Sequence, residues 1–348
     1  MAWKPFSALP NYFGGKQRLC PVIFREIAAV HPPRTWPQLT FIDAFMGAGS
    51  VSLYAKAQGF KVLANDLARR CHLVGKAIIE NNSQKLSDED LGLLFAERNG
   101  YDNFVERFYV PHTFRPKVAQ FLDKAFANLR DADLGEIHQA LLYTALIRFM
   151  LMIRIGGQMT NRAWCTNMTA GNYDAITPGQ LKRSQLQLEG IPRRIRRVQQ
   201  HINGGIFIGQ AQAFQEDALT WMPEQQADIV YLDPPYFGST SYEANYYHLD
   251  CILEGKRLPR YQHSPFNRRE AAWMSLVQMF DAADHIPTWV FSFADNPEGF
   301  SKGQVCSLIE EFGRVPKEVP LQHRWSIATG MDHYEAGAKE LLLICTPP

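Results

Sequence analysis

Residues 39–66 read LTFIDAFMGAGSVSLYAKAQGFKVLAND, and this stretch decides the fold. The apolar run 39–45 predicts a buried strand, and residues 50–58 predict a helix. A second strand is predicted over 61–66, followed by a helix over about 68–80. Because a helix joins the two strands, they form a βαβ unit, which indicates a parallel sheet of the α/β class.

The alternation of strand and helix resumes after a long helical segment, residues 81–202. Further strands are predicted over 204–209, 227–232 and 288–293, with a last strand over 339–346 paired to one near 314–320. Further helices are predicted over 17–30, about 268–284 and about 297–312, and a long polar loop over 237–266. The sequence therefore predicts one sheet, formed by residues 1–80 and 203–348, that is split by an inserted helical domain over 81–202.

The inserted segment differs from its flanks in charge. The net charge of the 348 residues is +1, but residues 101–200 contain 14 Lys and Arg against 8 Asp and Glu. A basic middle segment is typical of a protein that binds a polyanion such as nucleic acid. Solvated faces of Arg-rich helices would give the same count, so charge alone leaves both interpretations open.

Composition also limits the classes of protein to consider. The six cysteines are scattered without a zinc-type spacing, so we expect reduced thiols and no metal site. The N-terminus has no apolar signal region. The apolar stretch 140–157 is interrupted by Arg148 and Arg154, which favours a buried helix over a membrane span. We therefore expect a cytoplasmic protein that does not bind membranes.

The loop after the first strand carries the first candidate site. Asp43, Gly47 and Gly49 lie where open α/β sheets bind ligands, and Asp66 ends the next strand at a spacing suited to a ribose. A dinucleotide is disfavoured because G-x-G-x-x-G would need glycine in place of Ser52. An acid at position 43 suits a cationic ligand, so these residues predict a nucleoside cofactor with an amino or sulfonium group.

The stretch NYFGGK, residues 11–16, precedes the first predicted helix. Its two glycines and Lys16 could present backbone N–H groups and a cation to a carboxylate. On its own, this pattern favours a helix-starting loop with a surface lysine.

The stretch ADIVYLDPPYFG, residues 227–238, carries the second candidate site. A buried strand ends at Asp233, and Pro234 and Pro235 fix the backbone so that local carbonyls become rigid acceptors. Tyr236 offers a ring on which a base can stack. Two such acceptors would grip the exocyclic amino group of a nucleobase and stabilise the positive charge that grows as it attacks an alkyl donor.

Taken in order, NYFGGK, FIDAFMGAGSVSL, VLAND and YLDPPYFG resemble the D12-class, Dam-like DNA N6-adenine methyltransferases of the α group. The resemblance implies a Rossmann-like class I S-adenosylmethionine-dependent methyltransferase fold with an inserted helical target-recognition domain. It implies a catalytic motif that holds a flipped-out adenine of duplex DNA, formed by Asp233, Pro234, Pro235 and Tyr236. It implies S-adenosylmethionine contacts from Tyr12, Lys16, Asp43, Phe45, Gly47, Gly49, Asp66 and Asp233, and it places Ser292 and Phe293 near the target pocket.

The resemblance has gaps. The family often has an acidic contact to the cofactor's adenine before the D-P-P-Y motif, where this chain reads GQAQAF, so Gln210, Gln212 or Phe214 is expected to take that role. The long loop 237–266 is aromatic and basic, and we expect it to become ordered on nucleic-acid binding.

Three functions stay open at this point. An RNA adenine or DNA cytosine-N4 methyltransferase would share the same amino-group chemistry, and a catalytically idle nucleic-acid-binding module is the third possibility. A cognate restriction endonuclease is an expected partner of the leading candidate, a site-specific DNA adenine-N6 methyltransferase of a bacterium or phage.

Overall fold

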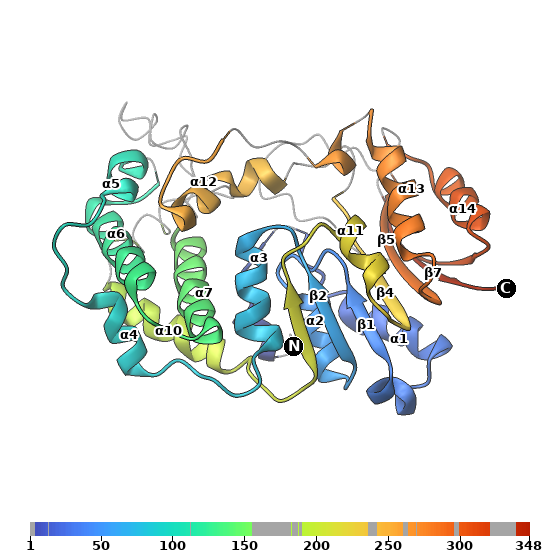
Figure 1. Cartoon of the computed structure of the whole chain (residues 1–348), viewed down its shortest axis with the longest axis horizontal. Coiled ribbons are helices and arrows are strands. Elements are labelled where there is room, and N and C mark those ends of the chain that lie inside the picture. The colour runs from blue at the N-terminus through green and yellow to red at the C-terminus, as the bar shows by residue number, and fades with distance from the viewer. Residues whose placement is uncertain are drawn as a thin grey trace.

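The structure is a computed structural model, organised around a seven-stranded sheet in the order β3-β2-β1-β4-β5-β7-β6 (Figure 1). It describes residues 4–12, 14–111, 113–154, 182, 187, 190–235, 242–259, 264–268, 270–295, 299–320 and 339–348. The strands are β1 (Thr40–Asp43), β2 (Lys61–Asn65), β3 (Ala211–Phe214), β4 (Ile229–Leu232), β5 (Thr288–Asp295), β6 (Val315–Pro320) and β7 (Lys339–Thr346). Strands β1 to β5 run parallel, while β7 is antiparallel to both β5 and β6.

Helices cover both faces of this sheet. The helices are α1 (Cys20–Val30), α2 (Ser50–Ala57), α3 (Arg69–Val74) with its π-helical continuation η3 (Gly75–Glu80), α4 (Asp88–Phe95), α5 (Phe104–Tyr109), α6 (Pro116–Asp131), α7 (Glu136–Ile153), α10 (Ile191–Asn203), α11 (Ala218–Trp221), α12 (Tyr242–Glu254), α13 (Ala272–Ala283) and α14 (Lys302–Glu311). Because side chains alternate along a strand, Phe41 and Ile42 enter different cores. The Phe41 core includes α1, α2 and α3, and the Ile42 core includes α11, α13 and α14. This three-layer arrangement confirms the predicted class I methyltransferase fold.

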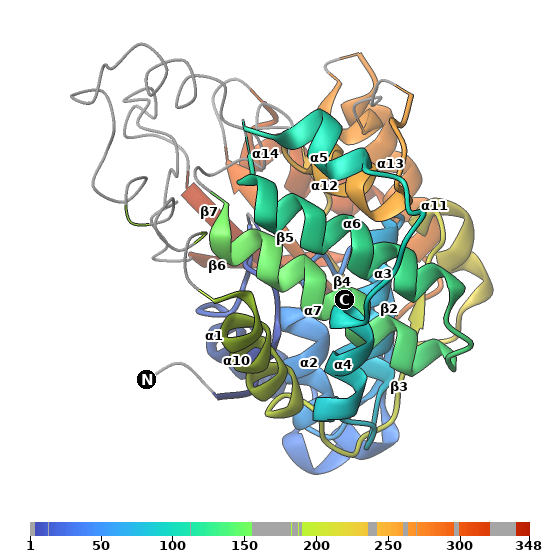
Figure 2. The same ribbon diagram turned by 90° about the vertical axis from the view of Figure 1, so that its left-hand side faces the viewer.

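The helices of residues 81–202 lie to one side of the sheet, and the core that they form is continuous with that of α3 (Figures 1 and 2). Within the described residues, α7 is the one helix long and apolar enough to cross a membrane, but 67% of it is buried inside the protein. Thr144 of α7 donates a hydrogen bond to the Leu73 carbonyl of α3, at 3.3 Å. The prediction of a buried helix at this position is confirmed.

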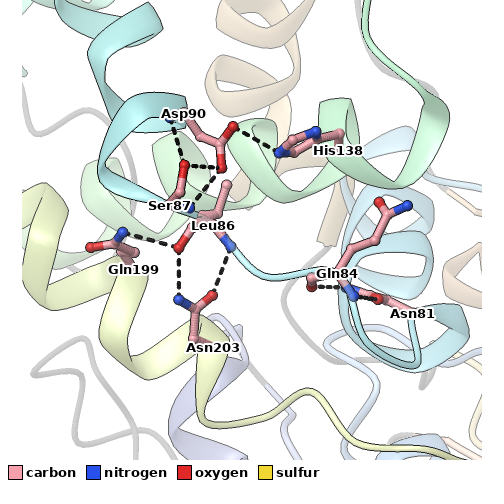
Figure 3. Close-up of polar contacts among 8 residues, drawn as sticks. All are labelled: Asn81, Gln84, Leu86, Ser87, Asp90, His138, Gln199 and Asn203. Atoms are coloured by element: carbon pink, nitrogen blue, oxygen red, sulfur yellow. Dashed lines mark hydrogen bonds and ion pairs between the residues drawn. The ribbon is translucent and has the colours of Figure 1, made fainter.

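The chain enters the helical segment near Leu86 and leaves it near Asn203. Side-chain hydrogen bonds join these two connections (Figure 3). Asn203, at the end of α10, accepts the Leu86 N–H at 2.9 Å and donates to the Leu86 carbonyl at 2.8 Å. Gln199 donates to the same carbonyl at 3.0 Å. Beyond this contact, Ser87 and Asp90 form a capping box at the start of α4, and Asp90 lies 2.9 Å from His138 of α7.

We expect Asn203→Ala to lower the free energy of unfolding by about 2 kcal/mol, because it leaves the N–H and a shared carbonyl of Leu86 without their amide partner. Asn203→Asp keeps the acceptor and loses the donor, so a smaller loss is expected. Urea unfolding followed by circular dichroism measures both values. A decrease in the free energy of unfolding of less than about 0.5 kcal/mol in Asn203→Ala would show that these hydrogen bonds contribute little to stability.

Two predicted elements are wrong. The segment 204–209 is not a strand, because Gly204 and Gly205 form the turn that ends α10 and Ile208 is 85% exposed. A Cβ atom at Gly205 would lie 2.3 Å from that of Ala8, so this backbone is packed tightly against the N-terminal segment. The strand is instead β3, which begins at Ala211.

The predicted loop 237–266 contains helix α12. Two ion pairs join α12 to α3, one between Arg70 and Asp250 at 2.5 Å and one between Arg69 and Glu254 at 2.6 Å. Tyr246 of α12 is also buried, so residues 242–254 form a packed helix where the sequence predicted a loop. That residues 237–266 become ordered on nucleic-acid binding stays a prediction. Residues 237–241 and 260–263 of that prediction lie outside the described residues.

Candidate active site

A cavity of about 570 Å³ lies at the carboxyl edge of the parallel strands. Its wall consists of residues that follow β1, β2, β3 and β4, of residues from the N-terminal segment, and of residues from α12 and the turn after it. Segments that are far apart in the sequence meet here because parallel strands all end at the same edge of the sheet.

Asp43 ends β1 and is almost fully buried at the cavity wall. Its Oδ2 accepts hydrogen bonds from the Ser52 hydroxyl at 2.6 Å and the Ser52 N–H at 3.1 Å. Its Oδ1 has no hydrogen-bond partner among the described residues. Burial raises the pKa of Asp43 to about 7; the Ser52 hydrogen bonds oppose this rise, while the nearby Asp233 carboxylate adds to it. A buried carboxylate oxygen without a partner is suited to a cationic donor from a ligand.

Asp66 holds the glycine loop that follows β1. Its Oδ2 accepts the Gly47 N–H at 2.9 Å, and its Oδ1 accepts the Ala68 N–H at 2.9 Å. Burial raises the pKa of Asp66, and these two hydrogen bonds oppose the rise. Each carboxylate oxygen can accept a further hydrogen bond, so Asp66 can bind a hydroxyl in the cavity while it positions the loop.

The loop itself needs glycine at two positions. Gly47 and Gly49 have φ values of +55° and +80°, a region that other residues rarely adopt. A Cβ atom at Gly49 would also lie 3.2 Å from Ile79, so η3 packs closely against this turn. The neighbouring Phe45 lines the cavity and contacts Phe266 edge to face, with ring centroids 5.6 Å apart.

Lys16 forms an ion pair with Asp233 at 2.9 Å, between the N-terminal segment and the end of β4. The side chains are only 6% and 16% exposed, so the expectation of a surface lysine is wrong. Pro234 is buried and Pro235 lines the cavity. Tyr236, the last residue of the predicted motif, lies outside the described residues.

Asn65 is a buried polar residue that the sequence analysis did not single out. Its amide nitrogen donates to the carbonyls of Ala44 and Glu216, at 3.3 and 3.1 Å, and its oxygen accepts the Glu216 N–H at 3.0 Å. Asn65 therefore ties the segments after β1 and β3 to the end of β2. A polar residue at the last position of a buried strand is the signal that could have revealed it.

The structure does not bring Gln212 and Phe214 to the cavity. Both belong to β3, and neither is among the residues that line the cavity. The acidic residues that follow β3 line it instead, namely Glu216 and Asp217. The strand was predicted over 204–209, several residues too early, so residues of the true strand β3 were predicted to be a ligand-binding loop.

Ser292 and Phe293 are also set apart from the cavity. Both are buried in β5, and neither lines it.

Tyr12 and α12 close one side of the cavity. The Tyr12 hydroxyl is buried without a hydrogen-bond partner among the described residues, and burial raises its pKa well above the usual value. The Tyr12 ring contacts that of Tyr246 edge to face, with centroids 4.9 Å apart. Arg70, paired with Asp250, lies 4.7 Å from the Tyr246 ring centroid. All four side chains line the cavity, which gives it a polar wall that the predicted loop did not suggest.

Comparisons with known proteins agree with this geometry. A family model described as D12 class N6 adenine-specific DNA methyltransferase matches residues 12–262. The chain is 22% identical to the type II methyltransferase M2.HphI of Haemophilus parahaemolyticus over 341 residues, which cover 96% of each protein. It is 27% identical to the modification methylase StsI of Streptococcus sanguinis over 254 residues, which cover 71% of this chain and 36% of that protein.

Proposed function

The chain belongs to the D12 class N6 adenine-specific DNA methyltransferase family, and on this premise we propose that it transfers a methyl group from S-adenosylmethionine to the N6 amino group of a flipped-out adenine in duplex DNA. That it is a DNA methyltransferase follows from the family. The observation that carries the finer proposal is the Lys16–Asp233 ion pair at the edge of a cavity that also contains the partnerless oxygen of Asp43.

The residues of the cavity fit S-adenosylmethionine. The partnerless Asp43 Oδ1 would accept from its α-amino group, and the Tyr12 hydroxyl would donate to its carboxylate. Asp66 would accept from the ribose, and Leu67, which is 68% exposed, would cover one face of the adenine. Acidic side chains outnumber basic ones along the wall, which favours a ligand with an amino and a sulfonium charge.

The contact to the cofactor's adenine was predicted for Gln210, Gln212 or Phe214. We assign it instead to the acidic residues after β3. Asp217 lines the cavity, and its Oδ1 accepts the Leu219 N–H at 3.0 Å, which fixes the carboxylate at the start of α11. We assign Asp217, with Glu216 beside it, to the amino group of that adenine.

At the target base, Asp233 and the Pro234 carbonyl would accept the two hydrogens of the amino group. This arrangement turns the nitrogen lone pair out of conjugation and stabilises the charge that develops as the nitrogen attacks. S-adenosylmethionine supplies an electrophilic methyl group on sulfur. Lys16 orients the Asp233 carboxylate, and Tyr236 would stack on the flipped base.

Residues 81–202 would then form the target-recognition domain, whose basic side chains contact DNA phosphates while others read base edges. The two relatives are a type II methyltransferase and a modification methylase, which supports a role in restriction and modification, with a cognate endonuclease as partner. Incubation with labelled S-adenosylmethionine and duplex DNA, single-stranded DNA or RNA tests the substrate class. Label in duplex DNA is expected, and label confined to RNA would contradict the proposal.

We predict that affinity for S-adenosylmethionine depends on pH through Asp43. Because the pKa of Asp43 is raised to about 7, its carboxyl is protonated below that pH and cannot accept from an ammonium group. The dissociation constant should rise by about tenfold for each pH unit below 7 and level off above about pH 8. Titration calorimetry from pH 5.5 to 8.5 measures it.

The matched control for this prediction is Asp43→Asn, which should bind more weakly and lose the pH dependence between 6 and 8. An equal pH slope in Asp43→Asn would assign the titration to another group.

The raised pKa of Asp43 also affects the stability of the free protein. The contribution of Asp43 to the free energy of unfolding is lost as the pH rises through about 7.

A further inference from the structure

Two arginines meet on the ring of Phe108, in a cluster that adjoins the cavity wall. The guanidinium carbon of Arg107 lies 4.8 Å from the centroid of this ring, and that of Arg257 lies 4.9 Å from it. Arg107 and Phe108 belong to α5, whereas Arg257 lies in the turn after α12. Two arginines that are 150 positions apart in the sequence therefore meet on one aromatic ring.

These arginines are accessible. Phe108 is 38% exposed, and both Lys256 and Arg257 are exposed. Arg107 forms a loose ion pair with Asp102 at 3.5 Å, in which both side chains are 55% exposed. Within the described part of the chain, no acidic side chain pairs with Arg257. The site is therefore a cationic surface whose charge is only partly compensated.

The position of this surface relates it to the cavity. Leu258 and Pro259, which directly follow Arg257, line the cavity wall. Figure 1 shows α5 and α12 along the same edge of the molecule. Arg257 is therefore adjacent in the chain to the cavity wall, and Arg107 shares the Phe108 ring with it.

The chemistry of the site favours phosphate over other ligands. A guanidinium that stacks on an aromatic ring keeps the N–H groups of its planar edge available, and these match two phosphate oxygens. The ring limits the motion of both side chains, so less rotamer entropy is lost on binding.

We propose that Arg107 and Arg257, oriented by Phe108, bind backbone phosphates of the DNA strand that carries the target base. This inference rests on the proposed function and adds a specific phosphate-binding site to it. The alternative is a purely structural cluster that fastens α5 to the turn after α12.

The test compares Arg107→Gln, Arg257→Gln and the double variant with the unaltered protein, by titration of a fluorescent duplex that the unaltered protein methylates. Each substitution should weaken DNA binding by about tenfold at 0.15 M salt. Each should also reduce the slope of log Kd against log salt by about one. Affinity for S-adenosylmethionine should stay within about twofold of the unaltered value, because neither residue lines the cavity.

Two controls keep the test decisive. Arg34→Gln removes an exposed arginine of η2 (Pro33–Gln38), just before β1 and therefore at the opposite edge of the sheet, and it should change neither Kd nor slope. Phe108→Leu keeps an apolar side chain and should weaken binding less than either arginine substitution, with little further loss in the Arg257→Gln background. An unchanged Kd and salt slope in the double variant would overturn the inference. Absence of methylation of any duplex by the unaltered protein would instead contradict the proposed function.

Discussion

Asp233→Ala should lower kcat for methyl transfer by about 10²- to 10³-fold and leave the affinity for S-adenosylmethionine within about threefold. The expected loss is large because Asp233 would hold the amino group of the base in the transition state, whereas the cofactor would be bound chiefly by residues after β1, β2 and β3. Single-turnover transfer to duplex DNA and titration calorimetry measure the two quantities.

Asp233→Asn is the matched variant for this experiment. It keeps one acceptor oxygen but loses the charge that pairs with Lys16, so its activity should lie between those of the alanine variant and the unaltered protein. Thermal unfolding of both variants separates lost chemistry from lost structure. Near-normal methyl transfer by a folded Asp233→Ala protein would show that Asp233 takes no part in the reaction.

Lys16→Met should be the second most damaging substitution. Removal of one partner from a largely buried ion pair leaves the Asp233 carboxylate uncompensated and costs on the order of 3 kcal/mol of stability. The carboxylate would also lose the contact that orients it toward the amino group of the base. Single-turnover transfer to duplex DNA should therefore fall by about 10²-fold.

Thermal unfolding of the variant distinguishes this effect from a simple loss of folding. Lys16→Arg keeps the charge that pairs with Asp233 and should retain most of the transfer. A folded Lys16→Met protein that transfers methyl groups as fast as the unaltered protein would show that Lys16 does not position Asp233.

The sheet could be predicted from the sequence because its signals are local. A few neighbouring residues are enough to predict each element of residues 39–66, namely a strand, a glycine turn, a helix and a second strand. These elements in turn place Asp43 and Asp66 at the ends of the two strands. The buried strand before Asp233 is recognisable for the same reason.

Other features depend on partners that are distant in the sequence. The local sequence predicts that Lys16 is a surface residue, because its partner Asp233 lies more than 200 residues later in the chain. Helix α12 buries apolar side chains such as Leu249 and Ile252, but its ion pairs with Arg69 and Arg70 are contacts that no local pattern shows. The error at β3 arose because the run Ile206–Ile208 is more apolar than the true strand, although Ile208 is exposed.

The central claim is that the reaction centre around Asp233 methylates the amino group of adenine. The most direct measurement is to incubate the protein with S-adenosylmethionine and duplex DNA of mixed sequence, digest the DNA to nucleosides and identify the methylated product by mass spectrometry. The expected product is N6-methyladenine, formed by the unaltered protein and absent with Asp233→Ala. N4-methylcytosine as the sole product, or N6-methyladenine formed equally by both proteins, would contradict the account.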